Sequence, residues 1–366
     1  MPHEEFMRAA LRLAIKGLGR TSPNPAVGAV IVKNGQIAST GYHRKAGGPH
    51  AEIEALAGAG RLKGATVYVT LEPCCHFGRT PPCTEALIRS GVKRVVVGAS
   101  DPNPRVSGKG IRALRRAGIE VIAGILRDEC AALNEPYNTY IRRRTPFVTL
   151  KLASSLDGRI ATSSGSSKWI TGVEARKSVH RLRSLNDAVM VGRNTVKNDD
   201  PELTVRLVRG SSPVRVVLDS LLETAPVAKV FNGVKEGKAR LLIFASKEVK
   251  ASRVRKAEGL GAEVILVQAT GSGLSLGTVM RELGKREITS VLVEGGSELA
   301  ASFISAGLVD KYVFFYGPML IGGDGLPMIA GLKVKGLVNA PRLERVKATT
   351  VGSCLAIVGY PAKRKG

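Results

Sequence analysis

A histidine and two cysteines in the first quarter of the chain have the residue types of a catalytic zinc site. His50 is followed by Cys74 and Cys83, which together supply one imidazole and two thiolates. Three protein ligands leave the fourth tetrahedral position open for a water molecule, and zinc lowers the pKa of that water to about 7. A structural zinc site would instead need a fourth protein ligand, for which Cys75 or His76 is available. The pattern predicts a zinc site and favours a catalytic one.

Glu52 stands two residues after the histidine, at a position where a zinc ligand is not needed. In zinc deaminases of nucleobases, the Glu of the H-x-E sequence is not a ligand and moves protons for the activated water. Glu52 is suited to this role, whereas neither a structural zinc site nor a pair of ordinary buried cysteines would explain it. We therefore predict that Glu52 is the catalytic acid–base of a hydrolytic deamination.

Length and composition are those of a two-domain enzyme with no membrane anchor. The chain has 366 residues, of which 44% are hydrophobic, enough for two cores of ordinary size. No stretch approaches the roughly 18 to 20 uninterrupted apolar residues of a membrane span, and the first residues lack the pattern of a signal peptide. Five cysteines, two of them assigned to zinc, do not make a disulfide framework. We expect a cytoplasmic protein with no membrane partner.

The formal net charge of +25 would be typical of a nucleic-acid-binding protein if it were concentrated. It is spread instead: residues 1–145 carry 22 Lys and Arg against 11 Asp and Glu, and residues 146–366 carry 33 against 19. Only 16 aromatic residues (7 Tyr, 8 Phe and 1 Trp) are available to stack on bases. Basic character in both halves suits an anionic, phosphorylated small substrate. We expect no nucleic-acid partner, and we expect a homo-oligomer.

Strand and helix patterns alternate along the chain, which predicts α/β domains with sheets covered by helices on both faces. In the first half we expect strands over 26–32, 66–71, 94–99 and 120–123 and helices over 3–17, 51–59, 83–90 and 111–117. The basic segment 142–146 predicts a domain boundary, and a second series follows it. There we expect strands over 147–152, 188–191, 214–219, 241–244, 264–267 and 290–294, and helices over 174–184 and 276–283.

A second site is indicated where the strand over 290–294 ends in Gly295 and Gly296 before a new helix. Glycines at this point let backbone N–H groups approach a phosphate at the helix N-terminus, so the segment suits an anionic ligand. A fingerprint of the G-x-G-x-x-G type is absent from residues 146–366, which argues against a Rossmann domain. Four polar segments lie at predicted strand ends or turns, where α/β sheets place ligand contacts: 154–159, 169–171, 191–196 and 199–206.

Taken together, these segments resemble one family. Eight residues, Cys75 to Pro82, separate the two cysteines, and this insert and the segment Thr21 to Gly28 look like the deaminase half of the bifunctional riboflavin-biosynthesis deaminase/reductases. The four polar segments of the second half, with Glu294 to Ser297, resemble the reductase half in the same order. The resemblance implies a cytidine-deaminase-like αβα sandwich followed by a dihydrofolate-reductase-like α/β domain.

The resemblance also implies an activity for each half. Residues 1–145 would be a zinc-dependent pyrimidine deaminase domain that hydrolytically deaminates 2,5-diamino-6-(5-phosphoribosylamino)pyrimidin-4-one. Residues 146–366 would be an NADPH-dependent reductase domain that reduces the ribosyl chain of the product to ribityl. The family's spacing assigns Cys74 as a ligand of Zn²⁺. The family usually has serine at position 75, so the adjacent thiol of Cys75 leaves the other register open.

A set of contact residues in the second half follows from the same resemblance. Two of them, Arg183 and Arg206, suit a phosphate because a guanidinium offers a planar bidentate fork. Asp199 is our best candidate for the proton donor of the reduction. Residues implied at NADPH are Ala153, Trp169, Thr195, Asp199, Ser220, Gly296, Ser297, Glu298, Leu299, Ala300, Ala301 and Ser302, and those implied at the substrate are Ser167, Arg183, Leu203, Arg206 and Glu294.

Two other functions are compatible with parts of the sequence. A nucleic-acid deaminase with a basic C-terminal binding domain would share the zinc chemistry and account for the charge, but not for the insert or the reductase-like segments. A chain whose C-terminal half only senses NADP or a pyrimidine would have no reductase turnover. Turnover with NADPH therefore distinguishes this second alternative from the bifunctional enzyme.

Overall fold

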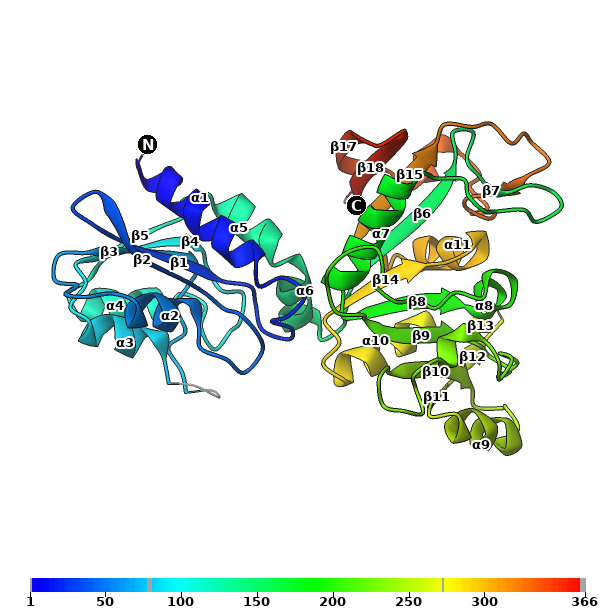
Figure 1. Cartoon of the computed structure of the whole chain (residues 1–366), viewed down its shortest axis with the longest axis horizontal. Coiled ribbons are helices and arrows are strands. Elements are labelled where there is room, and N and C mark those ends of the chain that lie inside the picture. The colour runs from blue at the N-terminus through cyan, green and yellow to red at the C-terminus, as the bar shows by residue number, and fades with distance from the viewer. Residues whose placement is uncertain (1, 78–80, 272, 363–366) are drawn as a thin grey trace. The chain divides into compact units, whose positions relative to one another are not determined.

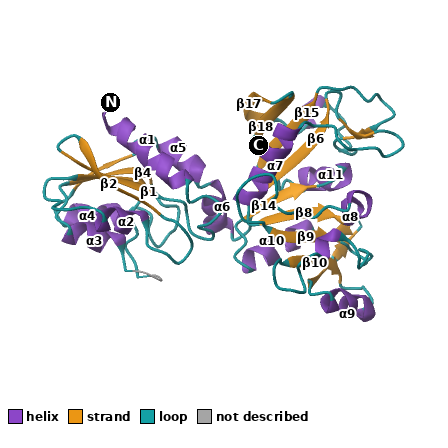
Figure 2. Cartoon of the chain, viewed as in Figure 1, coloured by secondary structure: helices purple, strands orange, loops and turns teal. Residues whose placement is uncertain are grey.

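The computed structural model describes residues 2–77, 81–271 and 273–362, and the chain divides into two compact units, Met1–Arg144 and Thr145–Gly366. Figure 1 labels the elements of both units, and Figure 2 separates helices from strands. Each unit has its own sheet and its own core. No helix in the described parts of the chain is long and apolar enough to cross a membrane.

The first unit is one sheet covered by helices on both faces. Its elements in chain order are α1 (Pro2–Ile15), β1 (Gly28–Lys33), β2 (Gln36–Tyr42), α2 (Ala51–Ala57), β3 (Thr66–Leu71), α3 (Cys83–Arg89), β4 (Arg94–Ala99), α4 (Lys109–Arg116), β5 (Glu120–Ala123), α5 (Arg127–Leu133) and α6 (Glu135–Arg143). The strand order is β2-β1-β3-β4-β5, with β3, β4 and β5 parallel and β1 antiparallel to both of its neighbours.

The core of the first unit has two layers because alternate residues of a strand point to opposite faces of a sheet. Ala29 and Ile31 of β1 pack in the layer that contains α2, α3 and α4, and Val30 and Val32 pack in the layer that contains α1 and α5. Figure 1 shows these two groups of helices on opposite sides of the sheet. Strands buried on both faces need unbroken apolar runs, and the sequences of the central strands β1, β3 and β4 are mostly apolar.

The second unit is built on a nine-stranded sheet. Its elements in chain order are β6 (Phe147–Ser155), β7 (Arg159–Ala161), α7 (Val173–Leu185), β8 (Ala188–Gly192), α8 (Arg193–Asp199), β9 (Val214–Leu218), η1 (Lys229–Phe231), β10 (Leu241–Ser246), α9 (Ala251–Gly259), β11 (Glu263–Val267), β12 (Ala269–Thr270), β13 (Gly273–Leu274), α10 (Leu276–Lys285), β14 (Ser290–Glu294), α11 (Ser297–Ser305), β15 (Lys311–Gly317), β16 (Leu326–Pro327), η2 (Leu337–Asn339), β17 (Leu343–Val351) and β18 (Cys354–Pro361).

Seven neighbouring strands of this sheet run in the same direction. The order is β11-β10-β9-β8-β14-β6-β15-β18-β17, parallel from β11 to β15 and antiparallel at β18 and β17. Helices α10 and α11 contribute Met280 and Phe303 to the core on one face, whereas α8 and α9 contribute Val196 and Ala257 on the other. Because the strands from β11 to β15 are parallel, their carboxyl ends lie at the same edge of the sheet. This edge is where open α/β sheets bind ligands.

The expected strands are present wherever an apolar run is buried. β3, β4, β5 and β14 have the expected bounds, and the other expected elements differ by a few residues at their ends. The expected helices are present too. The α/β class predicted from the sequence is confirmed.

The sequence pattern missed β2 and β17, which are mostly exposed edge strands without an apolar run. It also missed the short helices α5, α6, α8 and α9, the strand β18, and β15, which does carry a buried apolar run. An exposed strand keeps few hydrophobic side chains, so periodicity has little to detect there.

Asn134, at the junction of α5 and α6, ties the segment before β1 to these helices. Its side-chain Oδ1 accepts the Ala26 backbone N–H at 2.8 Å, and its Nδ2 donates to the Ala26 carbonyl at 2.9 Å. Asn134→Ala should leave two buried backbone groups unpaired and lower the stability of this unit by about 2 to 4 kcal/mol. Hydrogen–deuterium exchange of peptides that cover β1 measures this loss.

Asn138→Ala is the matched control, because that side chain makes one bond, to the Ala131 carbonyl at 3.0 Å. We expect a smaller effect of this variant on β1 exchange. Equal protection of β1 in the wild type and Asn134→Ala would contradict the anchoring role of Asn134.

Candidate active sites

The structure brings the three potential zinc ligands together from three separate segments. His50 is the residue before α2, Cys74 follows β3 by three residues, and Cys83 opens α3. Their ligand atoms all lie within 4.8 Å of one another. The Nδ1 atom of His50 is 3.2 Å from the Cys83 sulfur and 3.6 Å from the Cys74 sulfur. One nitrogen and two sulfurs at this spacing fit a tetrahedral zinc ion with one open position.

Cys74, and not Cys75, faces the other two ligand atoms. The Cys74 sulfur accepts the backbone N–H of Cys83 at 3.3 Å, whereas the Cys75 thiol donates to the Arg105 carbonyl at 3.8 Å. The register that the family spacing assigns is the one with the suitable geometry. Residues 78–80 of the insert between the cysteines lie outside the described residues.

Glu52 is buried beside this group, with 4% of its surface exposed. Burial raises the pKa of its carboxyl to about 7, and the negative charge of Cys74 acts in the same direction. The pKa of Cys74 itself is lowered to about 4, because the Cys83 thiol and His50 both donate hydrogen bonds to its sulfur. A carboxyl with a pKa near neutrality both takes up and releases protons readily, as general acid–base catalysis requires.

Two further polar side chains lie near the potential zinc ligands, one beside His50 and one beside that neighbour, and the sequence pattern did not single them out. The ring of His43 lies edge-on to that of His50, with centroids 5.5 Å apart. Its Nδ1 donates to the Pro49 carbonyl at 2.8 Å, and the Asn24 amide is 3.4 Å from its Nε2. Asn24 belongs to the segment Thr21 to Gly28, so the family resemblance was the one signal that could have indicated it.

Glu72 fixes the backbone on which Cys74 stands. Its buried carboxylate accepts backbone N–H groups of Asp101, Gly108 and Ile111 at 3.4, 2.9 and 3.2 Å. The last two belong to the start of α4, where backbone donors have no partner within the helix. These bonds join the chain after β3 to the loop after β4. They fix the start of the loop between Glu72 and Cys83, here called the cysteine loop, which carries Cys74.

The second unit has a large open cleft of about 2050 Å³ at the carboxyl ends of β6, β8, β9 and β14. Sites for one small ligand usually have about 300 to 1,000 Å³, so this cleft has room for two. Sixteen of the seventeen residues implied at NADPH or substrate line it. The exception is Ala300, which is fully buried in the core beneath α11, so its side chain contacts no ligand in the cleft.

The glycines between β14 and α11 form one wall of the cleft. Gly296 is the N-cap residue of α11 in an extended conformation. A Cβ added at Gly295 would lie 2.8 Å from a methyl carbon of Leu299, so a larger residue would require the Leu299 side chain to shift. Both glycines line the cleft at the start of α11, which fits a cofactor with phosphate groups.

Arg183, Glu294 and Lys151 form a buried ionic cluster at the base of the cleft. Arg183 binds Glu294 through two parallel hydrogen bonds of 2.6 and 3.0 Å, and Lys151 Nζ lies 3.8 Å from Glu294 Oε2. Burial alone would raise the pKa of Glu294, but the charges of Arg183 and Lys151 outweigh it and hold the pKa below its ordinary value. The cluster carries a net positive charge toward the cleft. Sequence patterns did not indicate Lys151, which lies inside an apolar strand.

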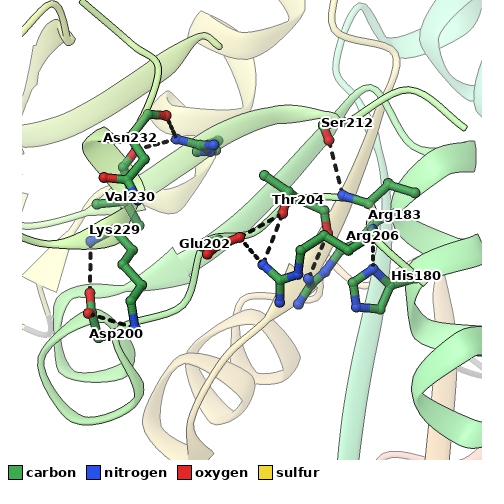
Figure 3. Close-up of polar contacts among 12 residues, drawn as sticks. His180, Arg183, Asp200, Glu202, Thr204, Arg206, Ser212, Lys229, Val230 and Asn232 are labelled. Atoms are coloured by element: carbon green, nitrogen blue, oxygen red, sulfur yellow. Dashed lines mark hydrogen bonds and ion pairs between the residues drawn. The ribbon is translucent and has the colours of Figure 1, made fainter. Parts of the chain in front are cut away.

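Arg206 stands at the cleft in a different environment from Arg183. Its side chain is half exposed and binds Glu202 and, at 3.0 Å, the hydroxyl of Thr204. The carbonyl of Thr204 accepts a hydrogen bond from Arg183 at 3.1 Å, so both guanidinium groups are tied to one residue (Figure 3). Two guanidinium groups side by side suit an anion with several oxygens.

The remaining implied residues differ in what they present to the cleft. The side chain of Leu203 is 1% exposed and packs in the core, and its φ is +55°, so a ligand would meet its backbone. Trp169 is 65% exposed, with Arg176 4.1 Å above its ring. The Ser167 hydroxyl donates to Asp199 at 3.4 Å.

Known proteins resemble this chain over both units. Two family models match: "Cytidine and deoxycytidylate deaminase zinc-binding region" over residues 1–99 and "RibD C-terminal domain" over residues 146–357. Riboflavin biosynthesis protein RibD of Aquifex aeolicus is 47% identical over 356 residues, which is 97% of this chain and 97% of that protein. The chain belongs to the RibD family. RibD of Escherichia coli is 41% identical, over 98% of this chain and 100% of that protein.

Solved RibD structures share the whole fold. Acinetobacter baumannii RibD superimposes with a TM-score of 0.89 at 38% identity, covering 99% of each chain. A diaminohydroxyphosphoribosylaminopyrimidine deaminase/5-amino-6-(5-phosphoribosylamino)uracil reductase from Thermotoga maritima gives a TM-score of 0.87 at 41% identity, again over 99% of each chain. Both folds implied by the sequence resemblance are confirmed.

Membership of the RibD family makes this chain a bifunctional deaminase and reductase of riboflavin biosynthesis. The cofactors are zinc for the deaminase and NADPH for the reductase, and the donor set and the cleft fit them. The alternatives of a nucleic-acid deaminase and of a C-terminal sensor lose their support, because the RibD C-terminal domain covers the second unit.

The geometry of the sulfurs predicts graded effects of serine substitutions. Cys74→Ser and Cys83→Ser should each lose zinc and deaminase activity, because a hydroxyl is a poor substitute for a thiolate ligand. Cys75→Ser is the control and should keep about one zinc per chain, measured by elemental analysis of the purified protein. Zinc retained in Cys74→Ser but lost in Cys75→Ser would reverse the assignment of the ligand.

Proposed function

We propose that His50, Cys74 and Cys83 hold the zinc ion of the deaminase and that Glu52 moves the protons of the reaction. The observation that carries the proposal is the buried carboxyl of Glu52 beside three ligand atoms that lie within 4.8 Å of one another. Bound zinc supplies a Lewis acid that activates water for attack on the amino-bearing carbon of the pyrimidine. Glu52 takes a proton from the attacking water and delivers it to the departing amine.

In the reductase domain, we propose that the cleft holds NADPH and the phosphorylated substrate at the same time. The cofactor would contact Ala153, Trp169, Thr195, Asp199, Ser220 and the segment 296–302, with the exception of Ala300, which does not line the cleft. NADPH supplies the hydride, and the protein's part is to orient the two ligands. The volume of the cleft supports this proposal.

We propose that the substrate lies at the positive end of the cleft, with its phosphate at Arg206. Arg183 gives three of its five N–H groups to Glu294 and Thr204, so it contributes mainly charge and position. Ser167, Glu294 and the backbone of Leu203 complete the substrate side. Asp199, which borders the cleft beside Ser167, stays our candidate proton donor.

We also propose that residues 1–145 and 146–366 are separate catalytic domains of a cytoplasmic homo-oligomer whose ligands are small molecules rather than nucleic acids. The compact division of the chain between Arg144 and Thr145 supports the two domains. The spread of the positive charge over both halves supports a small anionic substrate.

Glu52→Gln should keep zinc but lose about 10²- to 10⁴-fold in deaminase turnover, since the amide has the same shape and cannot carry the proton. Ammonia release from the diaminopyrimidine ribotide measures the loss. Glu54→Gln is the matched control, because Glu54 stands on the same helix and pairs with Arg44 at 3.1 Å. A loss below about tenfold in Glu52→Gln would show that another residue moves the proton.

Arg206→Ala should raise the KM of the reductase for its substrate by about 10- to 150-fold, because a charge-assisted hydrogen bond to phosphate is lost. The KM of NADPH should change little. Arg209→Ala, which removes an exposed charge three residues further on, is the control for a general electrostatic effect. Equal effects of the two substitutions on the substrate KM would remove Arg206 from the phosphate site.

A further inference from the structure

His180 is a buried histidine of the reductase cleft with no role so far. It lies on the inner face of α7, 6% exposed, and borders the cleft together with Arg183 and Arg206. Its Nδ1 accepts the backbone N–H of Arg206 at 3.0 Å, as Figure 3 shows. The contact joins α7 to the segment that carries the proposed phosphate ligand.

The hydrogen bond fixes the protonation state and tautomer of the ring. A backbone N–H is a donor only, so Nδ1 must be unprotonated and the single ring proton sits on Nε2. The surroundings of the ring also favour the neutral form. Burial lowers the pKa of His180 most, and the positive charges of Arg183 and Arg206 lower it further. Lys151 acts in the same direction, whereas Glu294 opposes it. His180 is therefore a neutral N–H donor among cations.

Arg206 depends on few contacts for its position. The side chain of Arg206 reaches only Glu202 and Thr204, both on its own segment, among the contacts of the described residues. From outside the segment, Ser212 accepts the Val205 N–H at 3.0 Å, and Arg183 donates to the Thr204 carbonyl. Of these anchors, the bond from His180 is the one made to Arg206 itself. Loss of that bond frees the backbone of the residue at the proposed phosphate site.

The other ring nitrogen has no protein partner among the described contacts. Figure 3 draws a hydrogen bond at one nitrogen of His180 only. Because the residue borders the cleft, its Nε2–H is available to a ligand oxygen there. A phosphorylated sugar chain offers such oxygens as phosphate and hydroxyl groups, and both accept hydrogen bonds from a neutral donor.

We propose that His180 is a substrate-positioning residue of the reductase, which fixes the Arg206 backbone through Nδ1 and donates from Nε2 to an oxygen of the phosphorylated sugar chain. The proposal rests on the proposed function, since it assumes that this end of the cleft takes the deaminated substrate. It adds a second, uncharged means of recognition to the two guanidinium groups.

Two substitutions test the Nδ1 contact with the Arg206 backbone and the Nε2 contact with the substrate separately. In His180→Asn, the amide oxygen takes the position of Nδ1, so the Arg206 anchor is kept and the donor is lost. In His180→Gln, the longer amide takes the position of Nε2, so a donor is kept and the anchor is lost. His180→Phe removes both. Arg181→Gln is the control, because Arg181 is the next residue of α7 and is exposed.

The measurement is steady-state reduction of 5-amino-6-(5-phosphoribosylamino)uracil by the full chain, with the KM of substrate, the KM of NADPH and kcat determined for each variant. We expect a substrate KM raised about 10-fold or more in His180→Asn and about 2- to 10-fold in His180→Gln. The substrate KM should be highest in His180→Phe, which loses both contacts. The KM of NADPH and kcat should stay within about threefold, since the proposed contact of this ring is with the phosphorylated chain of the substrate and not with the reacting atoms.

A wild-type substrate KM in His180→Asn would overturn the donor role of Nε2 and leave His180 only as an anchor of the Arg206 backbone. Wild-type substrate KM values in both His180→Asn and His180→Gln would overturn the proposal entirely. If His180→Phe does not fold, the Asn and Gln variants still decide. Failure of the proposed function is distinct, because the wild type and Arg181→Gln would then bind NADPH without reducing the ribotide, which overturns both.

Discussion

Both active sites of this chain depend on the common direction of parallel strands. In the first unit, β3 and β4 end side by side, with Leu71 opposite Ala99, and the cysteine loop and the loop that Glu72 anchors emerge at the same edge. In the second unit, β6, β8, β9 and β14 end together around the cleft. Parallel strands return through helices, so each strand end is followed by a loop and a helix start, where ligand groups gather. One structural rule thus provides a metal site and a two-ligand cleft.

The two sites manage buried charge in opposite ways. Near the proposed zinc ligands, Glu52 has no ion pair with a lysine or arginine among the described residues, and burial raises its pKa to about 7, which suits the proton exchange proposed for it. In the reductase cleft, Glu294 is buried between Arg183 and Lys151 and its pKa is lowered, so it stays ionised and holds the arginine in place. Isolated burial therefore produces a proton carrier, and paired burial produces a fixed anchor.

Chemistry that is local in the chain could be predicted from the sequence, and chemistry assembled across it could not. His50 and Glu52 lie two residues apart at a helix start, so their spacing alone carries the prediction. Arg183 and Glu294 are 111 residues apart, and only the sheet brings them together. Nearly all the residues that the resemblance implies at NADPH or substrate line the cleft. The resemblance did not reveal that Ala300 faces the core, because successive residues of a helix point in different directions and its neighbours Leu299 and Ala301 line the cleft.

The central claim is that this chain carries out deamination and reduction in sequence at two separate sites. The direct test is incubation of the purified chain with 2,5-diamino-6-(5-phosphoribosylamino)pyrimidin-4-one and NADPH, with ammonia and nicotinamide absorbance followed together. We expect ammonia to appear first and NADPH then to be oxidised in equal amount, as the deaminated ribotide formed in the first step is consumed in the second. Oxidation of NADPH that precedes or exceeds the release of ammonia, or ammonia release with no oxidation at all, would contradict the central claim.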